Sequence, residues 1–274
     1  MARQSPLTNS SAPSFSRSVR SASILSDRVS QLLGKIDCKL AETTEEREAI
    51  FRLRYRAYMR ERAISQNSSG TFFDHYDENG NGFLFGFYID GELASSIRVH
   101  VASKENPDFT SLGVFSDLLQ PELDAGKVIV DPTRFVTDET ASRLYRALPY
   151  VTLRVAGMAC EYFGGDHLLA TVRREHEAFY RRTFHHRLIC EARPYPGLTT
   201  PLSLMIMHYP SLAEGLYQRY PFFRSTPDER RLLFGHHQRP VSPREAVDDG
   251  PARGPTGADR RLVEGLRRMP WVTD

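Results

Sequence analysis

The stretch Val130-Asp131-Pro132-Thr133-Arg134-Phe135 places an acid and a base three positions apart at the end of an apolar run. Proline has no N–H to donate to a sheet, so within strands it is found at edges, strand starts and bulges. A bulged or splayed strand end would expose backbone N–H groups, which can bind a carbonyl oxygen or the amide of a pantetheine arm. Asp131 and Arg134 fit such a binding site, and their spacing fits a structural ion pair equally well.

Two arginines stand on faces that the apolar pattern predicts to be buried. Arg54 and Tyr58 are four apart on one face of a predicted helix, and Arg98 lies within an apolar strand. A buried guanidinium group needs an anionic partner. Asp74 and Asp77, three apart in a loop, can both reach one cation, and we expect one of them to pair with Arg54 or Arg98. Because buried ion pairs are poor contributors to stability, their concentration favours an active site.

A third pair of functional side chains follows a predicted buried strand. His176 and Tyr180 are four apart and share one face of a helix. A histidine in this position can act as a base and a tyrosine as a proton donor. Packing of Phe179 and Tyr180 into the core is the alternative explanation of the same pattern.

The elements that must position these side chains do not alternate regularly between strand and helix. Apolar periodicity and turn residues predict a helix over 45–62, a hairpin over 83–101 through Asp90-Gly91, a strand over 127–135, a helix over 138–163 broken or bent near Pro149, a strand over 168–172, a helix over 175–183, and strands over 187–191 and 202–207. This order predicts an α+β, mixed three-layer α/β/α domain with a mostly antiparallel central sheet. It disfavours a doubly wound dinucleotide fold, and neither common glycine-rich phosphate loop is present.

Length and composition set outer limits on function. The chain has 274 residues and a formal net charge of +2, which gives no field that would demand nucleic acid or an anionic membrane. The longest apolar runs are far shorter than the ~20 residues of a membrane span, so no stable insertion is expected. The three cysteines are isolated, which predicts reduced thiols, no metal site and a cytoplasmic setting.

Composition also divides the chain. Residues 1–24 are rich in Ser and Arg and lack acids, which predicts a disordered tail, and 25–36 fit a short amphipathic helix. The folded domain is expected over 37–234. Residues 235–274 predict a Gly/Pro-rich disordered tail with a short terminal helix as an option.

The ordered set of motifs resembles the acyl-homoserine-lactone synthases, and more closely the N-acyl amino acid synthases. Tyr58, Ile64 and Asp131 stand where the lactone synthases usually have Phe, Trp and Glu. The loss of the Trp puts lactone-type substrate recognition in doubt. The resemblance covers roughly residues 40–210 and rests on the stretches Leu53-Arg54-Tyr55-Arg56-Ala57-Tyr58, Asp74-His75-Tyr76-Asp77, Asp131-x-x-Arg134-Phe135, Ala170-x-Val172-Arg173-x-x-His176 and Arg193-Pro194-Tyr195-Pro196-Gly197-Leu198.

The resemblance implies a GNAT-like acyltransferase fold and an N-acyltransferase activity. A fatty acyl group would pass from an acyl carrier protein thioester to the amine of a free amino acid, with acyl-phosphopantetheine as donor and no bound cofactor. The usual coenzyme A loop, Q/R-x-x-G-x-G/A, is not visible after Phe135, which fits a carrier-protein donor. A lactone-type signal synthase and a non-catalytic protein that binds acyl carrier protein or lipid remain alternatives.

The resemblance also implies roles for single residues in this bacterial type of enzyme. Asp131 is the first candidate for the base and His176 the second, while Arg134 would orient Asp131 or hold a substrate carboxylate. The expected substrate- and acyl-binding residues are Arg54, Tyr58, Asp74, Asp77, Arg98, Phe115 and Tyr180. A carrier protein is acidic, so basic side chains should receive it, and the candidates are Arg143, Arg146, Arg154, Arg181 and Arg182.

Overall fold

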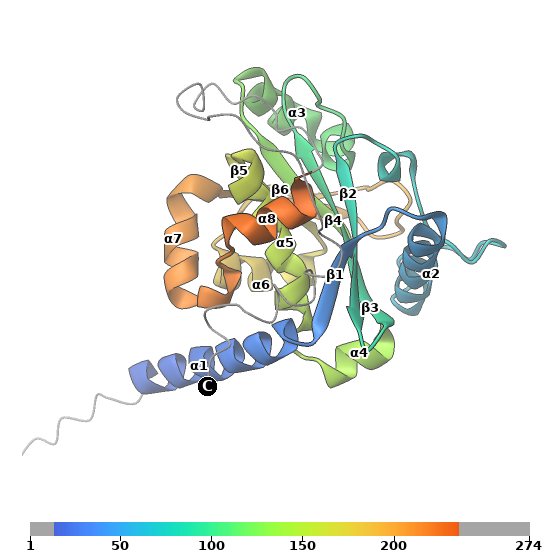
Figure 1. The fold of residues 1–274 in the computed structure, drawn as a ribbon. Helices are drawn as coiled ribbons and strands as arrows, with labels where there is room; N and C mark the ends of the chain where they lie inside the picture. The colour runs from blue at the N-terminus through green and yellow to red at the C-terminus, as the bar shows by residue number, and fades with distance from the viewer. Residues whose placement is uncertain (1–13, 236–274) are drawn as a thin grey trace, which may run out of the picture.

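The computed structural model describes residues 14–235, with side chains described from residue 24 onward (Figure 1). Its sheet has seven strands in the order β1-β2-β3-β4-β5-β7-β6. The strands are β1 (Ile36–Leu40), β2 (Gly82–Ile89), β3 (Glu92–Ala102), β4 (Ile129–Thr137), β5 (His167–Val172), β6 (Arg187–Arg193) and β7 (Leu202–His208). Only the β4–β5 pair is parallel among these strands, so the predicted mixed, mostly antiparallel fold is confirmed.

Helices cover both faces of the sheet, as Figure 1 shows. The helices are α1 (Ser14–Leu33), α2 (Thr44–Arg60), α3 (Thr110–Asp124), α4 (Glu139–Leu144), α5 (Leu148–Phe163), α6 (Arg174–Phe184), α7 (Tyr209–Arg219) and α8 (Pro227–Phe234), with short 3-10 turns at His75–Asp77 and Pro221–Phe223. The main core lies between the sheet and the helices α1, α5, α7 and α8. A second core lies under α3 on the opposite face. None of the described helices is long and apolar enough to cross a membrane.

Several element boundaries differ from the sequence predictions. Helix α1 spans Ser14–Leu33 and not 25–36, so the predicted disordered tail over 1–24 is wrong from residue 14 onward. The helix expected over 138–163 is interrupted at Tyr145–Ala147 between α4 and α5, so the break predicted near Pro149 is present a few residues earlier. Pro149 itself occupies the first turn of α5, where its missing N–H is tolerated. The predictions for residues 1–13 and 236–274 lie outside the described residues.

The most consequential feature of the sheet is the end of strand β4. Its register with β3 shifts between Arg98↔Thr133 and Ser96↔Val136, so β4 carries an extra residue there, and Arg134 has a positive φ of 55°. On its other side β4 pairs with β5 at only two positions, Ile129↔His167 and Val130↔Leu168. The two strands then separate. The bulged and splayed strand end predicted from the sequence is therefore confirmed.

Candidate active site

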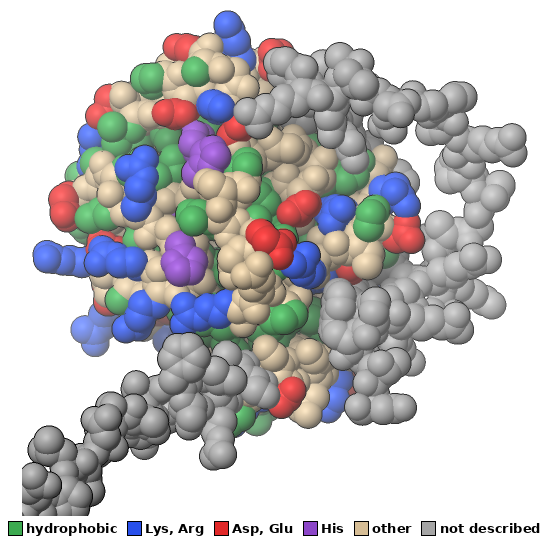
Figure 2. Space-filling model, turned by 90° about the vertical axis from the view of Figure 1, so that its left-hand side faces the viewer, with side chains coloured by type: hydrophobic (Ala, Val, Ile, Leu, Met, Phe, Trp, Pro, Cys, Tyr) green, Lys and Arg blue, Asp and Glu red, His purple; other side chains and the backbone are tan. Residues whose placement is uncertain are grey.

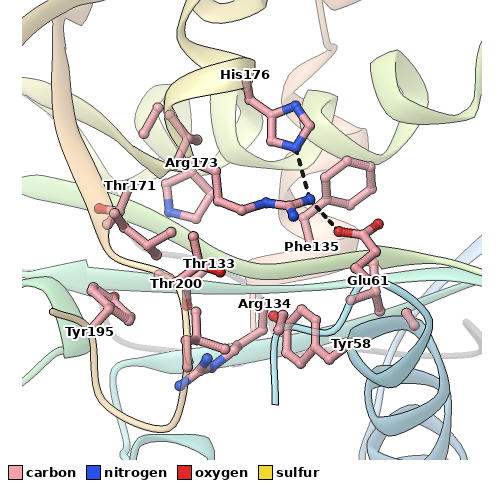
Figure 3. Close-up of a pocket in the computed structure, with 18 of the residues that line it drawn as sticks. Tyr58, Glu61, Thr133, Arg134, Phe135, Thr171, Arg173, His176, Tyr195 and Thr200 are labelled. Carbon is pink, nitrogen blue, oxygen red and sulfur yellow. Dashed lines mark hydrogen bonds and ion pairs between the residues drawn. The ribbon is translucent and has the colours of Figure 1, made fainter. Parts of the chain in front are cut away.

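A cavity of about 460 Å³ occupies the space where β4 and β5 separate (Figure 3). Its walls come from the end of α2, strands β4 and β5, the start of α6 and the loop after β6. The lining includes both apolar and hydrogen-bonding groups, namely Tyr58, Glu61, Thr133, Arg134, Phe135, Thr171, Arg173, His176, Phe179, Tyr180, Tyr195 and Thr200. The site is thus created by strand pairing that stops after two residues.

Five charged side chains form a buried cluster next to this cavity. Arg54 donates to both carboxylate oxygens of Asp77, at 2.8 and 2.9 Å. Arg98 lies 2.6 Å from Asp74 and 3.0 Å from Asp77. Arg134 donates to Asp74 from Nε at 3.2 Å and from Nη2 at 2.7 Å. The predicted pairing of the two aspartates with the inward arginines is confirmed.

The cluster fixes the charge of both aspartates. Burial raises the pKa of Asp74, but the hydrogen bond and charge of Arg98 and the charge of Arg134 outweigh it, so the pKa ends well below its ordinary value. Asp77 behaves in the same way: burial raises its pKa, and the charges of Arg54 and Arg98 lower it further than burial raises it. Neither carboxylate is therefore suited to taking a proton near neutral pH.

Arg134 does not pair with Asp131, contrary to one of the two predicted roles. Its Nε and Nη2 bind Asp74, and its guanidinium lies 4.9 Å from the ring centre of Phe72 and 6.0 Å from that of Tyr195. Among the described residues, its Nη1 has no hydrogen-bond partner although the side chain is only 6% exposed. Arg134 is also one of the residues that line the cavity.

Asp131 occupies a different place from the one its predicted role requires. It is 0% exposed and is absent from the cavity lining, so a substrate in the cavity does not touch it. Neither carboxylate oxygen has a hydrogen-bond partner in the described part of the chain. Burial raises the pKa of Asp131 to about 6, although the nearby Ser111 and the charge of Arg98 lower it. Asp131 can hold a proton near neutral pH, but only an intermediate group can connect it to the cavity.

His176 and Tyr180 both line the cavity, as the sequence predicts, but in unequal environments. His176 is exposed at the mouth, where its Nε2 lies 3.3 Å from the guanidinium of Arg173. Arg173 also binds Glu61 at the end of α2, so the three side chains bridge the opening, as Figure 3 shows. The Tyr180 ring packs beside Phe184, and burial raises its pKa, which makes it a poor proton donor.

Of two other residues predicted to bind substrate, one lines the cavity and the other does not. Tyr58 lines the cavity and meets Phe72 edge to face, with ring centres 5.2 Å apart. Phe115 is 0% exposed in the second core and is not among the residues that line this cavity, so its role in acyl binding stays a prediction.

The sequence prediction missed several hydroxyl groups at the cavity. Tyr195 and Arg173 stood in the motifs that carry the resemblance but had no assigned role, while Ser111 and Thr171 gave no signal at all. Arg193 positions the loop that carries Tyr195 through a bidentate contact with Asp117 of α3, at 2.7 and 2.9 Å. Within residues 24–235, no three His, Cys, Asp or Glu side chains are grouped so that they could hold a metal ion.

The basic side chains proposed to receive a carrier protein are not all exposed. Arg154 is 4% exposed and bonded to Glu229, so its inclusion was wrong. Arg143 and Arg146 are exposed around the start of α5, and Arg181 and Arg182 are exposed at the end of α6. Figure 2 views the molecule from the α7 side and shows Lys and Arg side chains gathered toward one edge of that face.

A bulged strand that splays from its parallel neighbour around a cavity, within a mostly antiparallel sheet covered by helices, defines a GNAT-like acyltransferase. The family model of the N-acyl amino acid synthase FeeM matches residues 49–208. The chain belongs to this N-acyl amino acid synthase family.

Two solved structures illustrate the likeness of fold. FeeM, an N-acyl amino acid synthase from uncultured soil microbes, is 14% identical with a TM-score of 0.56, and the match covers 66% of this chain and 95% of FeeM. TofI, solved in a ternary complex with an inhibitor and MTA, is 15% identical with a TM-score of 0.50, over 69% of this chain and 100% of TofI. No curated protein matches the sequence.

Proposed function

We propose that this acyltransferase moves a fatty acyl group from the phosphopantetheine thioester of an acyl carrier protein to the α-amine of an amino acid. The observation that carries the proposal is buried Arg134, which lines the cavity at the bulge of β4 and has an unpartnered Nη1 among the described residues. This places a carboxylate-binding donor next to the backbone groups that suit a thioester.

The donor arm fits the open edge of β4. From Asp131 onward, the backbone groups of β4 that face β5 have no strand partner in the described sheet. The amides of a phosphopantetheine arm can bind such an edge as an added strand does. Backbone N–H groups at the bulge can then stabilise the oxyanion that forms when the amine attacks.

The acceptor fits the part of the cavity next to Arg134. The free Nη1 offers a charge-assisted hydrogen bond to an α-carboxylate. Attack of the amine nitrogen on the thioester carbon forms the amide bond and breaks the C–S bond, so the thiol of the arm leaves. The ammonium must first lose a proton to a base. His176 lines the cavity directly, whereas Asp131, whose pKa burial raises to about 6, needs a connection to it.

A carrier protein is favoured over coenzyme A as the source of the arm. The Q/R-x-x-G-x-G/A loop that cradles the coenzyme A phosphates is missing between Phe135 and α5, where the chain forms α4. Exposed arginines on α4, on the connection to α5 and at the end of α6 can attract an acidic partner. These are Arg143, Arg146, Arg181 and Arg182.

The test is acyl transfer by the purified full chain, followed by mass spectrometry. Acyl carrier protein and coenzyme A thioesters of several chain lengths are each offered with the free amino acids and, separately, with S-adenosylmethionine. We expect an N-acyl amino acid from the carrier-protein donor, and far less with the Asp131→Asn variant. A lactone product would favour the signal-synthase alternative. No transfer from either donor would contradict the proposal and favour a binding protein.

A further inference from the structure

The carboxylate of Asp131 is separated from the cavity by the first turn of α3. Ser111, the second residue of that helix, is itself 0% exposed. Its hydroxyl and its backbone N–H both approach the carboxylate closely enough to lower the pKa of Asp131, although neither reaches full hydrogen-bond geometry. Ser111 is therefore the group through which Asp131 meets the rest of the site.

A chain of hydroxyl groups continues from Ser111 into the cavity. The Ser111 Oγ lies 2.9 Å from the Thr171 Oγ1 and 3.4 Å from the Tyr195 Oη. Thr171 and Tyr195 both line the cavity, on the same side of it in Figure 3. A hydroxyl donates one hydrogen bond while it accepts others, so a hydrogen-bonded chain of hydroxyl groups can transfer a proton from one end to the other.

We propose that Ser111 and Thr171 relay the substrate's proton to Asp131, so that a buried carboxylate serves as the base for an amine it never touches. The inference rests on the acyl-transfer function proposed above. The relay runs through Thr171 because its contact with Ser111 is the shorter one. Tyr195 then holds the Ser111 oxygen in place.

The proton balance of the relay is simple. The ammonium of the acceptor gives one proton to the Thr171 oxygen, Thr171 gives its own proton to Ser111, and Ser111 gives its own to Asp131. The amine keeps the electron pair that attacks the thioester. Each hydroxyl receives one proton and gives one away, so both are neutral hydroxyl groups again after the transfer. Asp131 then releases this proton to water. The second proton, which the attacking nitrogen loses as the C–S bond breaks, goes to the leaving thiolate, so a neutral thiol departs.

The charges around Asp131 suit a group that gains and loses a proton. Both buried aspartates of the cluster stay ionised against three arginines, so one positive charge is left over, and an ionised Asp131 balances it. Burial and the charge of Arg98 lower the pKa of His100 to about 3, so this neighbour across the strand pair stays neutral. The titratable and charged groups that face Asp131 are Arg98 and His100 of β3, Arg134 of β4 and Tyr195 of the loop after β6.

The first test compares Ser111→Ala and Thr171→Val with the wild-type chain by the pH dependence of kcat. In the wild type we expect kcat to fall below an apparent pKa near 6. Each variant should lose about 10²-fold in kcat, the scale of general-base catalysis, with little change in KM and without that acid limb. Ser111→Thr keeps a hydroxyl and should restore most of the rate. Ser203→Ala, which removes another 0% exposed serine hydroxyl, should leave rate and profile unchanged.

A second measurement does not depend on turnover. After a pH jump, time-resolved infrared spectroscopy follows the carboxyl band that Asp131→Asn removes. We expect protonation of Asp131 to be at least tenfold slower in Ser111→Ala than in the wild type. An unchanged protonation rate overturns the relay, as does a variant with normal kcat and pH profile. A wild-type chain that transfers no acyl group overturns the proposed function, and the infrared result then still decides the relay.

Discussion

Arg134 and Arg154 are both buried arginines held by a carboxylate, yet they are used differently. Arg154 of α5 donates to the backbone carbonyls of Phe222 and Arg224 and to Glu229, and its remaining nitrogen lies 3.2 Å from the Met158 sulfur. Arg134 binds only Asp74 within the described structure and keeps Nη1 unpartnered. Each nitrogen of Arg154 therefore has a contact within the core, whereas Arg134, which lines the cavity, has one nitrogen without a hydrogen-bond partner among the described residues.

The two arginines also belong to different parts of the chain. Arg134 lies in the bulge of β4, whereas Glu229, the partner of Arg154, stands on α8, beyond the matched residues 49–208. Figure 1 shows α8 lying over the same face of the sheet as α5. Phe234 at the end of α8 packs against Phe83 and Phe163, with ring centres 5.3 Å away in both cases. The Arg154–Glu229 pair therefore fastens a C-terminal addition onto the family domain.

The largest effect is expected from Arg154→Met. This change leaves Glu229 buried without its cation, and breaking a buried pair in this way costs ~3–5 kcal/mol in the free energy of unfolding. Urea unfolding measures the loss. The folded fraction should keep its kcat, because Arg154 does not face the cavity. The double variant Arg154→Met/Glu229→Leu should recover most of the stability. A large loss of kcat with normal stability would contradict the comparison.

Asp131→Asn is expected to stabilise the chain at alkaline pH. The pKa of about 6 in the folded chain against an ordinary 3.8 corresponds to ~3 kcal/mol. The folded chain binds this proton more tightly than the unfolded one, so the penalty is absent below about pH 4, grows as the pH rises and is complete above pH 6. Unfolding at pH 4 and pH 8 should therefore show the variant's advantage only at pH 8. An equal difference at both pH values would mean that Asp131 ionises as an ordinary aspartate.

A smaller effect should follow from Arg134→Lys. Lysine keeps the positive charge beside Asp74 but cannot bind it in bidentate fashion and still present a third donor to the cavity. We expect KM for the amino acid to rise about 30-fold, or ~2 kcal/mol, while KM for the acyl donor changes little. Steady-state kinetics with each substrate varied in turn measures the two values. A rise confined to the donor would place the free Nη1 on the other substrate.

The smallest effect sets the baseline for the comparison. Arg52 and Glu48 form an exposed pair on α2, with side chains 57% and 49% exposed. Such a pair contributes at most ~0.5 kcal/mol, so Arg52→Ala should leave both unfolding and kinetics nearly unchanged. A cost comparable to that of Arg154→Met would show that burial is not what separates the arginines of this chain.

The pairing of the charged cluster could be predicted from the sequence, whereas the burial of Asp131 away from the cavity could not. Arg54 and Arg98 lie in apolar patterns, and a buried guanidinium must find an anion, so their pairing with the two aspartates followed from local information. Asp131 is buried by α3, which sequence signals do not reveal. The residue before this helix, Phe109, supplies no capping side chain, and Pro121 stands inside it.

Arg154 illustrates the same limit at longer range. Its helical position looked solvent-exposed because the sequence of α5 does not disclose that α8, about 75 residues later, folds back over it. The burial of Phe115 outside the cavity lining has a related reason, since the depth of a cavity depends on how neighbouring elements close over it. Side chains whose surroundings come from adjacent residues were predictable, and those enclosed by distant segments were not.

The two-residue pairing between β4 and β5 divides the sheet into a four-stranded part and a three-stranded part. Few backbone hydrogen bonds join the parts, and the cavity exists only where they stand side by side. A molecule that fills the cavity therefore contacts both and acts as a bridge between them. Because such a ligand binds only the assembled chain, its binding free energy adds to the stability of the whole fold. A bound substrate therefore helps to hold together the two parts of the sheet, which few backbone hydrogen bonds join.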